Sequence, residues 1–429
     1  MTNCRQVYVH SADTYAAMPE QRSIPTYVLL ILLLGSVVGP HRAAAQSGSD
    51  TETDAGRFFP RQGFMLSGYG GAGYDVLLAD GSRPNDFSAV FAPIMLFQIS
   101  DRFLFEGELE FEIEEGATET GLEYAQIDMA ATNNLTLIAG KFLLPFNVFS
   151  ERLHPTWINR LVSSPALYGG HGALTPTDPL VPMLSDVGIQ LRGAFAVGRF
   201  STITAEAFVT QGPMPAADEH AEEPDEAGDG HQEAPAGGTV APDDLAFGSD
   251  FTDNNEDKMI GGRIGFGVAP HVEFNISGMT GAFDAAGDLR FSALGAHLES
   301  RYRNFTVHGE FIQTWQDVAE ADAHDEEGGP GGAPPDTDRA ETAVETLARN
   351  GYWMLLSYRW RKWQPVVRWT QVFESDIDGT VVTAAGRQLA IGLDYWFEPA
   401  LAIKLEYLIN DEEHPVDNNR LAVQLAFGF

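Results

Sequence analysis

Cysteine is almost absent from the sequence, since Cys4 is the single cysteine among 429 residues. A disulfide framework and a metal site built from cysteine thiolates are therefore both excluded. Basic residues are scarce as well: 26 Lys and Arg stand against 61 Asp and Glu, which gives a formal net charge of −35. A chain this acidic does not bind nucleic acid through the release of phosphate counterions. It is expected to attract cations and repel polyanions, although a saline habitat would also select an acidic exterior.

Long apolar runs are missing after the first 45 residues. Before that point, residues 27–38 form an apolar run that Arg22 precedes and a row of alanines ending at Ala45 follows. This order of charge, apolar run and small residues predicts a secretory signal peptide over 1–45, cleaved after Ala45, and a short lead over 46–62. No later stretch is apolar enough for a transmembrane helix, so any passage through a membrane requires strands.

Catalytic sequence motifs are missing too. The sequence has no nucleophile elbow, no phosphate loop and no HExxH, so we predict that the protein is not an enzyme and needs no cofactor. A hydrolase carried on strand ends would use isolated residues, and His154, His297 and His308 are the candidates for it. We interpret these histidines as pore-wall or loop residues instead.

What the sequence has in abundance is alternation of apolar and polar residues, which predicts strands with two different faces. Strands of about 9–11 tilted residues suffice to cross a bilayer. Turn signals divide the chain from Gly63 onward into about sixteen such segments. The predicted strands span residues 63–74, 87–99, 102–114, 120–131, 134–143, 185–197, 199–211, 257–269, 271–282, 289–301, 304–316, 350–361, 363–374, 386–397, 400–410 and 419–429.

The last predicted strand shows this pattern most clearly. One face carries Leu421, Val423, Leu425, Phe427 and Phe429, whereas the other face carries small or polar residues. Such a strand could pack one face on the core of a soluble sandwich. Because it closes on a phenylalanine, however, it is similar to the assembly signal of bacterial outer-membrane barrels. Phe427 and Phe429 are then the residues that the barrel-assembly machinery would recognise.

The lengths of the connections favour a barrel over a sandwich. Every second connection is a tight turn, such as 100–101 and 197–198, whereas most of the others are long and polar. Tight turns on one rim and long loops on the other are typical of outer-membrane barrels. We therefore predict an all-β fold, a transmembrane antiparallel β-barrel of about sixteen strands over 63–429, in the lipid of a bacterial outer membrane. Its main long loops are 144–184, 212–256 and 317–349.

One predicted strand carries a row of acids on a single face, Glu106, Glu108, Glu110 and Glu112, which we call the glutamate row. Lipid would penalise these side chains, so they are expected to line the lumen, where a row of carboxylates favours cations. Basic residues of other strands could instead neutralise the row. Those available are Arg192, Arg263, Arg301, Arg359 and Arg368, of which Arg192, Arg263 and Arg368 are predicted to line the pore.

Loop 144–184 differs from the other long loops because it is aromatic and much less acidic. Side chains such as Phe149 and Trp157 are poorly suited to water, so we predict that this loop folds into the lumen. There it would face the glutamate row and set the constriction. Lys141 and Arg152, at the start of the loop, are predicted to line the pore as well.

The strand that leads into this loop continues through Gly140, Lys141, Pro145 and Phe146, which form a GKxxxPF pattern. In this respect the chain resembles the phosphate-selective porin O/P-like family of outer-membrane channels. The resemblance implies a porin, and porins of this size commonly form homotrimers. The predicted strands lack the lumenal ladder of Arg and Lys that phosphate-selective members have, so the expected preference is for cations.

Two loop segments are strongly acidic and contain histidine: 218–233 carries His220 and His231, and 317–327 carries His324. Imidazole and carboxylate can bind Zn²⁺, Ni²⁺ or Cu²⁺, but the Pro, Gly and Ala content favours solvated, disordered segments. The leading prediction is therefore passive diffusion of small hydrophilic solutes or ions through an outer-membrane porin that prefers cations. The alternatives are a barrel that anchors a divalent-metal-binding surface or takes up metal, and a substrate-specific porin of the phosphate type.

Overall fold

The computed structural model describes residues 63–78, 86–114, 117–169, 179–182, 184–215, 245–248, 253–269, 271–319, 344–377, 380–412 and 418–429. The signal peptide predicted over 1–45, the lead over 46–62 and the loop histidines His220, His231 and His324 lie outside these residues. Among the described residues, no helix combines the length and the apolarity that crossing a membrane requires.

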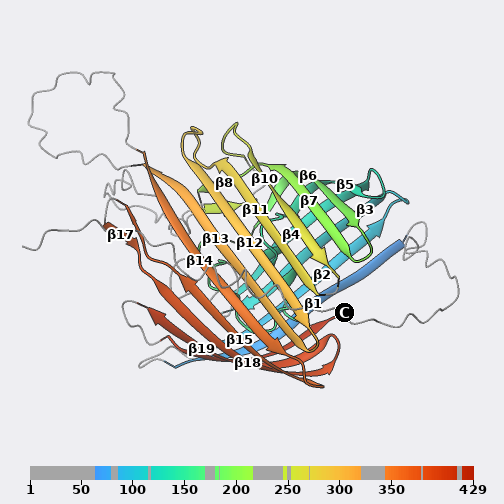
Figure 1. Cartoon of the computed structure of the whole chain (residues 1–429), viewed down its shortest axis with the longest axis vertical. Helices are drawn as coiled ribbons and strands as arrows, with labels where there is room; N and C mark the ends of the chain where they lie inside the picture. The colour runs from blue at the N-terminus through green and yellow to red at the C-terminus, as the bar shows by residue number, and fades with distance from the viewer. Residues whose placement is uncertain are drawn as a thin grey trace, which may run out of the picture. The chain divides into compact units, whose positions relative to one another are not determined.

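Sixteen antiparallel strands close into one barrel (Figure 1). Each strand pairs with the next barrel strand along the chain, and the last strand closes the barrel by pairing with the first. This confirms the predicted all-β barrel of about sixteen strands. The strands of the barrel are β1 (Gly63–Leu77), β2 (Asp86–Gln98), β3 (Phe103–Glu114), β4 (Ala117–Ala130), β5 (Leu135–Leu143), β6 (Ser185–Val197), β7 (Ser201–Thr210), β10 (Met259–Val268), β11 (Val272–Ala282), β12 (Arg290–Tyr302), β13 (Phe305–Ala319), β14 (Val344–Tyr358), β15 (Trp363–Val372), β18 (Gly386–Glu398), β19 (Leu401–Glu412) and β20 (Arg420–Gly428).

The clearest departure from the predicted strands is the hairpin of β13 and β14. β14 begins at Val344 instead of residue 350, and the ladder between the two strands extends to the pair Ala319↔Val344. Part of the predicted loop 317–349 is therefore strand. The alternation simply continues there, because Val318 and Leu347 are buried like the inward residues before and after them.

Two hairpins of very short strands also occur in stretches that were predicted as loops. They are β8 (Pro213–Pro215) with β9 (Leu245–Phe247), and β16 (Ser375–Ile377) with β17 (Thr380–Thr383). Strands of three or four residues are too short to display a period-two pattern, so the sequence carried no signal for them.

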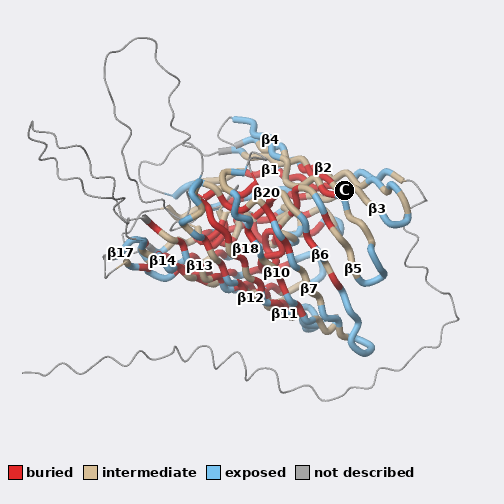
Figure 2. Tube along the Cα trace, turned by 90° about the horizontal axis from the view of Figure 1, so that it is seen from above, coloured by how far each residue is buried: buried red, intermediate tan, exposed pale blue. Residues whose placement is uncertain are grey.

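The two faces of the barrel wall differ in chemistry. On β19, Ile403 and Leu405 are exposed on the outer face, whereas Lys404 and Glu406 are each only 1% exposed. Figure 2 shows that buried residues gather in the middle of the barrel. Apolar side chains outside and ionised side chains inside reverse the arrangement of a soluble protein, and they match a wall with lipid on its outer face.

The C-terminal residue lies at the seam where the barrel closes. The backbone of Phe429 exchanges two hydrogen bonds with Gly68 of β1, at 3.1 and 3.0 Å. Its ring stacks on Phe91 of β2 with 5.7 Å between ring centroids and lies 6.3 Å from the ring of Phe427. Both phenylalanines predicted as the assembly signal are therefore placed at this seam.

Candidate functional site

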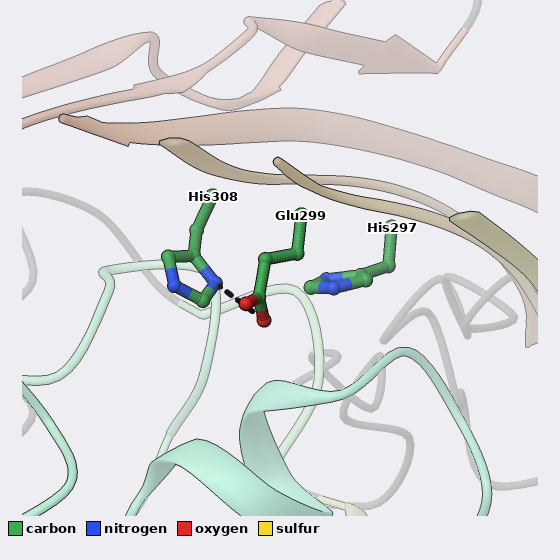
Figure 3. Close-up of side chains that lie close together, drawn as sticks. All are labelled: His297, Glu299 and His308. Carbon is green, nitrogen blue, oxygen red and sulfur yellow. Dashed lines mark ion pairs between the residues drawn. The ribbon is translucent and has the colours of Figure 1, made fainter. Parts of the chain in front are cut away.

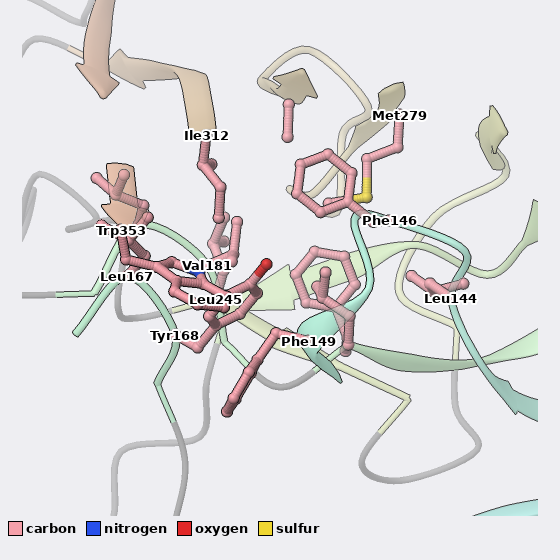
Figure 4. Packing of buried hydrophobic residues seen from close by; sticks show 14 of the residues in the cluster. Leu144, Phe146, Phe149, Leu167, Tyr168, Val181, Leu245, Met279, Ile312 and Trp353 are labelled. Atoms are coloured by element: carbon pink, nitrogen blue, oxygen red, sulfur yellow. The ribbon is translucent and has the colours of Figure 1, made fainter. Parts of the chain in front are cut away.

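The described part of the connection between β5 and β6 (144–169, 179–182 and 184) lies against the inner face of the barrel wall, and we call it the inward segment. It contains the one-turn π-helix η1 (Phe149–Leu153). Most of the aromatic and aliphatic side chains that predict an inward fold are buried here, with those of strand residues such as Ile312 and Trp353 (Figure 4), whereas Trp157 is half-buried. Phe149 stacks on Tyr168, with 5.1 Å between the ring centroids.

A buried glutamate on β13 fixes the start of the inward segment. Glu310 Oε1 accepts hydrogen bonds from the backbone N–H groups of Val148 at 2.8 Å and Phe149 at 3.0 Å. Its Oε2 accepts from the Tyr168 hydroxyl at 2.7 Å and from the Trp353 indole N–H at 3.0 Å. We call Glu310 the first anchor, because one carboxylate joins two parts of the segment to the wall.

A second anchor, formed by Arg368 of β15 with Lys404 and Glu406 of β19, holds the middle of the segment. Glu406 Oε2 accepts hydrogen bonds from the N–H groups of Val162 at 2.6 Å and Ser163 at 2.8 Å. Arg368 donates to the carbonyl and the hydroxyl of Ser163, both at 2.7 Å. The ammonium of Lys404 donates to three backbone carbonyls of the segment, those of Thr156, Asn159 and Leu161.

The wall also makes room for the segment at two glycines. A Cβ atom at Gly392 of β18 would come within 2.4 Å of the Leu161 side chain, and one at Gly351 of β14 within 2.7 Å of the Leu167 side chain. Glycine leaves space on a strand where another chain segment approaches closely. Polar contacts therefore hold the segment at the two anchors, and the side chains of Leu161 and Leu167 pack against the wall at the two glycines.

A charged cluster joins η1 to the wall at β6, β7, β10 and β11. Arg263 is the centre of this cluster, since it is 6% exposed and its Nη2 lies 2.6 Å from carboxylate oxygens of both Glu151 and Glu206. The cluster contains three arginines and three glutamates, so its formal charges cancel: Arg152, Arg192, Arg263, Glu151, Glu206 and Glu273.

Most of the predicted pore-lining arginines are therefore engaged in contacts outside the glutamate row, but Arg192 also lies close enough to Glu106 for an electrostatic interaction. Arg152, Arg192 and Arg263 have ion pairs within the charged cluster, and Arg368 belongs to the second anchor. Among the described residues, these contacts do not support neutralisation of the row by Arg152, Arg263 or Arg368, whereas Arg192 offsets part of the charge at Glu106. Arg301 is paired with Glu299, and Arg359 donates to Gln364 at 3.1 Å.

A cavity of about 320 Å³ remains between the inward segment and the wall formed by β1 to β5, β19 and β20. Five carboxylates and two cationic side chains line it: Asp75, Glu110, Glu112, Glu123 and Glu406 with Lys141 and Arg420. Arg420 forms an ion pair with Asp75 at 3.2 Å, and Glu406 is held by the second anchor. Lys141 lies near Glu123, so one cationic side chain stands against Glu110, Glu112 and Glu123, and this part of the lining keeps an excess of carboxylates.

Two members of the glutamate row, Glu110 and Glu112, reach this cavity, and Tyr69 donates a hydrogen bond to Glu110 at 2.9 Å. Glu108 is buried with an exposed fraction of 2%, and Glu106 is half-buried outside the lining. His154 of the inward segment also lines the cavity, and desolvation lowers its pKa to about 4. This imidazole is therefore neutral near pH 7 and adds no positive charge.

No known protein-family model matches the chain, and no curated protein matches it either. Solved structures do match. An OmpF of Salmonella typhi in complex with daunomycin is 11% identical, with a TM-score of 0.53 over 86% of this chain and 98% of that chain. An anion-selective porin of Comamonas acidovorans is 10% identical, with a TM-score of 0.50 over 86% of this chain and all of that chain. At such low identity the likeness shows a shared porin fold, and it does not single out the phosphate-selective porin O/P-like family.

Proposed function

We propose that this protein is a passive channel of the bacterial outer membrane that lets small hydrophilic solutes through and prefers cations. The observation that carries the proposal is the acidic cavity between the inward segment and the wall, where Glu110, Glu112 and Glu123 face the remaining lumen. A barrel of sixteen strands has a backbone diameter on the order of 30 Å, too wide for wall side chains alone to fill. The inward segment narrows that lumen.

The sign of the selectivity follows from the lining residues and not from the fold. The similar porin of Comamonas acidovorans is described as anion-selective. In this chain carboxylates outnumber cationic side chains in the cavity lining, and the arginines of the charged cluster are matched by glutamates. Fixed negative charge beside a narrow aqueous path accumulates cations and excludes anions.

Membrane placement can be tested by a pair of lysine substitutions on the two faces of the wall. Ile264 on β10 is 68% exposed on the outer face, whereas Gln424 on β20 faces the lumen. Ile264→Lys is expected to cost about 2–4 kcal/mol of unfolding free energy in lipid vesicles, because an ammonium would sit in hydrocarbon. Gln424→Lys should cost much less. Equal losses in urea titrations of the two variants would contradict a lipid-facing outer surface.

The ion selectivity can be tested by neutralising three carboxylates of the cavity lining with substitutions to glutamine, which has nearly the same volume as glutamate. The triple variant Glu110→Gln, Glu112→Gln, Glu123→Gln is expected to bring the cation-to-anion permeability ratio close to one, because the excess negative charge of the lining is lost. The measurement is the reversal potential of single channels in a salt gradient.

A matched control removes the same number of charges from exposed positions in or beside turns, through Asp101→Asn, Asp288→Asn and Glu398→Gln. This control should keep the cation preference of the parent protein. The proposal fails if the triple lining variant keeps that preference as well, or if the parent channel prefers anions.

A further inference from the structure

Two histidines and a glutamate face one another on the inner side of β12 and β13 (Figure 3), in a part of the barrel that the conduction proposal does not use. His297 and Glu299 are two residues apart on β12, so their side chains share the inner face. The ladder pairs Glu299 directly with His308 of β13 and His297 with Glu310. One ligand-type atom from each of His297, Glu299 and His308 lies within 4.8 Å of the others.

The separation of Glu299 and His308 suits a shared metal ion better than it suits a direct hydrogen bond. Glu299 Oε2 lies 3.5 Å from His308 Nδ1, which is long for a hydrogen bond. Two ligands at 2.0–2.1 Å from a tetrahedral Zn²⁺ lie about 3.3 Å from each other. The observed separation is therefore close to that of two ligands sharing one ion.

Three ring nitrogens of these two histidines have no hydrogen-bond partner among the described residues. His297 and His308 are 1% and 2% exposed. Among the described residues, Nε2 of His297 and both ring nitrogens of His308 make no hydrogen bond. A buried polar atom without a partner is costly, and a bound ion is one way to satisfy it.

The surrounding groups also fit a metal centre. Glu310 Oε1 lies 3.1 Å from Nδ1 of His297, which is the carboxylate contact that orients a histidine for metal binding through its Nε2. The other oxygen of Glu299, Oε1, is paired with Arg301, so Oε2 points toward the imidazoles. Arg160 lines a small cavity together with His308. The two arginines balance Glu299 and Glu310 in formal charge, and neutral imidazoles suffice as the main ligands of Zn²⁺.

We propose that His297, Glu299 and His308 form a binding site for a divalent transition-metal ion of the Zn²⁺ type inside the barrel wall. Two imidazole nitrogens with one carboxylate oxygen are a ligand set that binds Zn²⁺, whereas Ca²⁺ and Mg²⁺ prefer sites made of oxygen ligands alone. The ion would occupy the wall beside the first anchor, because Glu310 contacts both His297 and the inward segment. These residues differ from the loop histidines that the sequence suggested, which lie outside the described residues.

The test is Zn²⁺ binding to the full chain, purified in detergent, with Zn²⁺ alone as the probe. The parent for this experiment carries His220→Asn, His231→Asn and His324→Asn, which removes the loop histidines from the measurement. Isothermal titration and metal analysis after dialysis are expected to give one Zn²⁺ per chain. Co²⁺ in place of Zn²⁺ should give the intense visible absorption of a four-coordinate nitrogen and oxygen site.

The double variant His297→Asn, His308→Asn should abolish this stoichiometric binding. Glu299→Gln, which preserves side-chain volume and keeps both imidazoles, should weaken it by more than about tenfold, since even changes in second-shell residues cost that much. His271→Asn is the matched control, because His271 lies at an exposed turn. β-Sheet circular dichroism identifies any variant that has failed to fold.

The melting temperature supplies a second readout. An ion that binds the folded barrel and not the unfolded chain raises the midpoint of unfolding. Zn²⁺ should therefore raise it in the parent and in His271→Asn, and should raise it clearly less in Glu299→Gln at the same concentration. The proposal is overturned if the parent shows no saturable Zn²⁺ binding, or if folded Glu299→Gln and the double histidine variant bind Zn²⁺ as the parent does.

Discussion

Replacing Glu310 with leucine is expected to release the start of the inward segment and to raise single-channel conductance severalfold. The Glu310 carboxylate accepts four hydrogen bonds: two from backbone N–H groups, one from the Tyr168 hydroxyl and one from the Trp353 indole. Leucine fills the volume and accepts from none of them, so four buried donors lose their partner. Each buried donor left without a partner costs about 1–3 kcal/mol, so the packed position of the segment should become unfavourable. The segment would then no longer narrow the lumen.

The conservative variant Glu310→Gln provides the comparison for this prediction. Glutamine keeps one carbonyl oxygen but presents an amide N–H₂ group where Oε1 or Oε2 now accepts. It should therefore give a conductance between those of the parent and Glu310→Leu. Glu398→Leu, at the exposed end of β18, controls for the loss of a carboxylate in general. An unchanged conductance in a folded Glu310→Leu channel would show that this carboxylate does not hold the segment.

The barrel itself could be predicted from the sequence because its signal is local. A strand with lipid on one side and water on the other must alternate, and each alternating segment can be recognised without knowing its neighbours. The terminal strand and the row from Glu106 to Glu112 illustrate this, since parity alone assigns each side chain to a face. The extension of β13 and β14 was missed because a long polar connection without a sharp turn signal obscures where pairing stops.

The partners of the inward-facing side chains could not be predicted in the same way. Parity places Glu310 and Glu406 inside the barrel, but their partners in the inward segment are 142 to 244 residues away in the chain. Alternation carries no information about such distant contacts. For the same reason Arg263 and Arg368, which were expected to line the pore, could not be assigned to the contacts that they make with the inward segment. Glu123 was missed because the irregular pairing of β3 with β4 interrupts the alternation near it.

Lys404→Met, in the second anchor, is expected to raise the conductance as Glu310→Leu does but to shift the selectivity in the opposite direction. Lys404 is 1% exposed and donates to three carbonyls of the inward segment, so methionine leaves those carbonyls without their donor. It also removes a positive charge beside Glu406 and opposite Asp394, its ladder partner on β18. The lumen becomes more negative by one charge, whereas Glu310→Leu makes it less negative by one.

Because the two variants change the charge in opposite directions, they distinguish the effect of pore width on selectivity from the effect of fixed charge. If the inward segment sets the width and fixed charge sets the selectivity, both variants conduct more, but only Lys404→Met increases the cation preference above that of the parent. Adding Asp394→Asn to Lys404→Met restores the charge balance, so the double variant should keep the high conductance and lose the gain in cation preference. The difference should shrink as the salt concentration rises from 0.1 to 1 M, because the Debye length falls from about 10 Å to about 3 Å. If reversal potentials shift in the same direction in Lys404→Met and Glu310→Leu, then selectivity follows from the opening of the lumen and the acidic lining does not act as the filter.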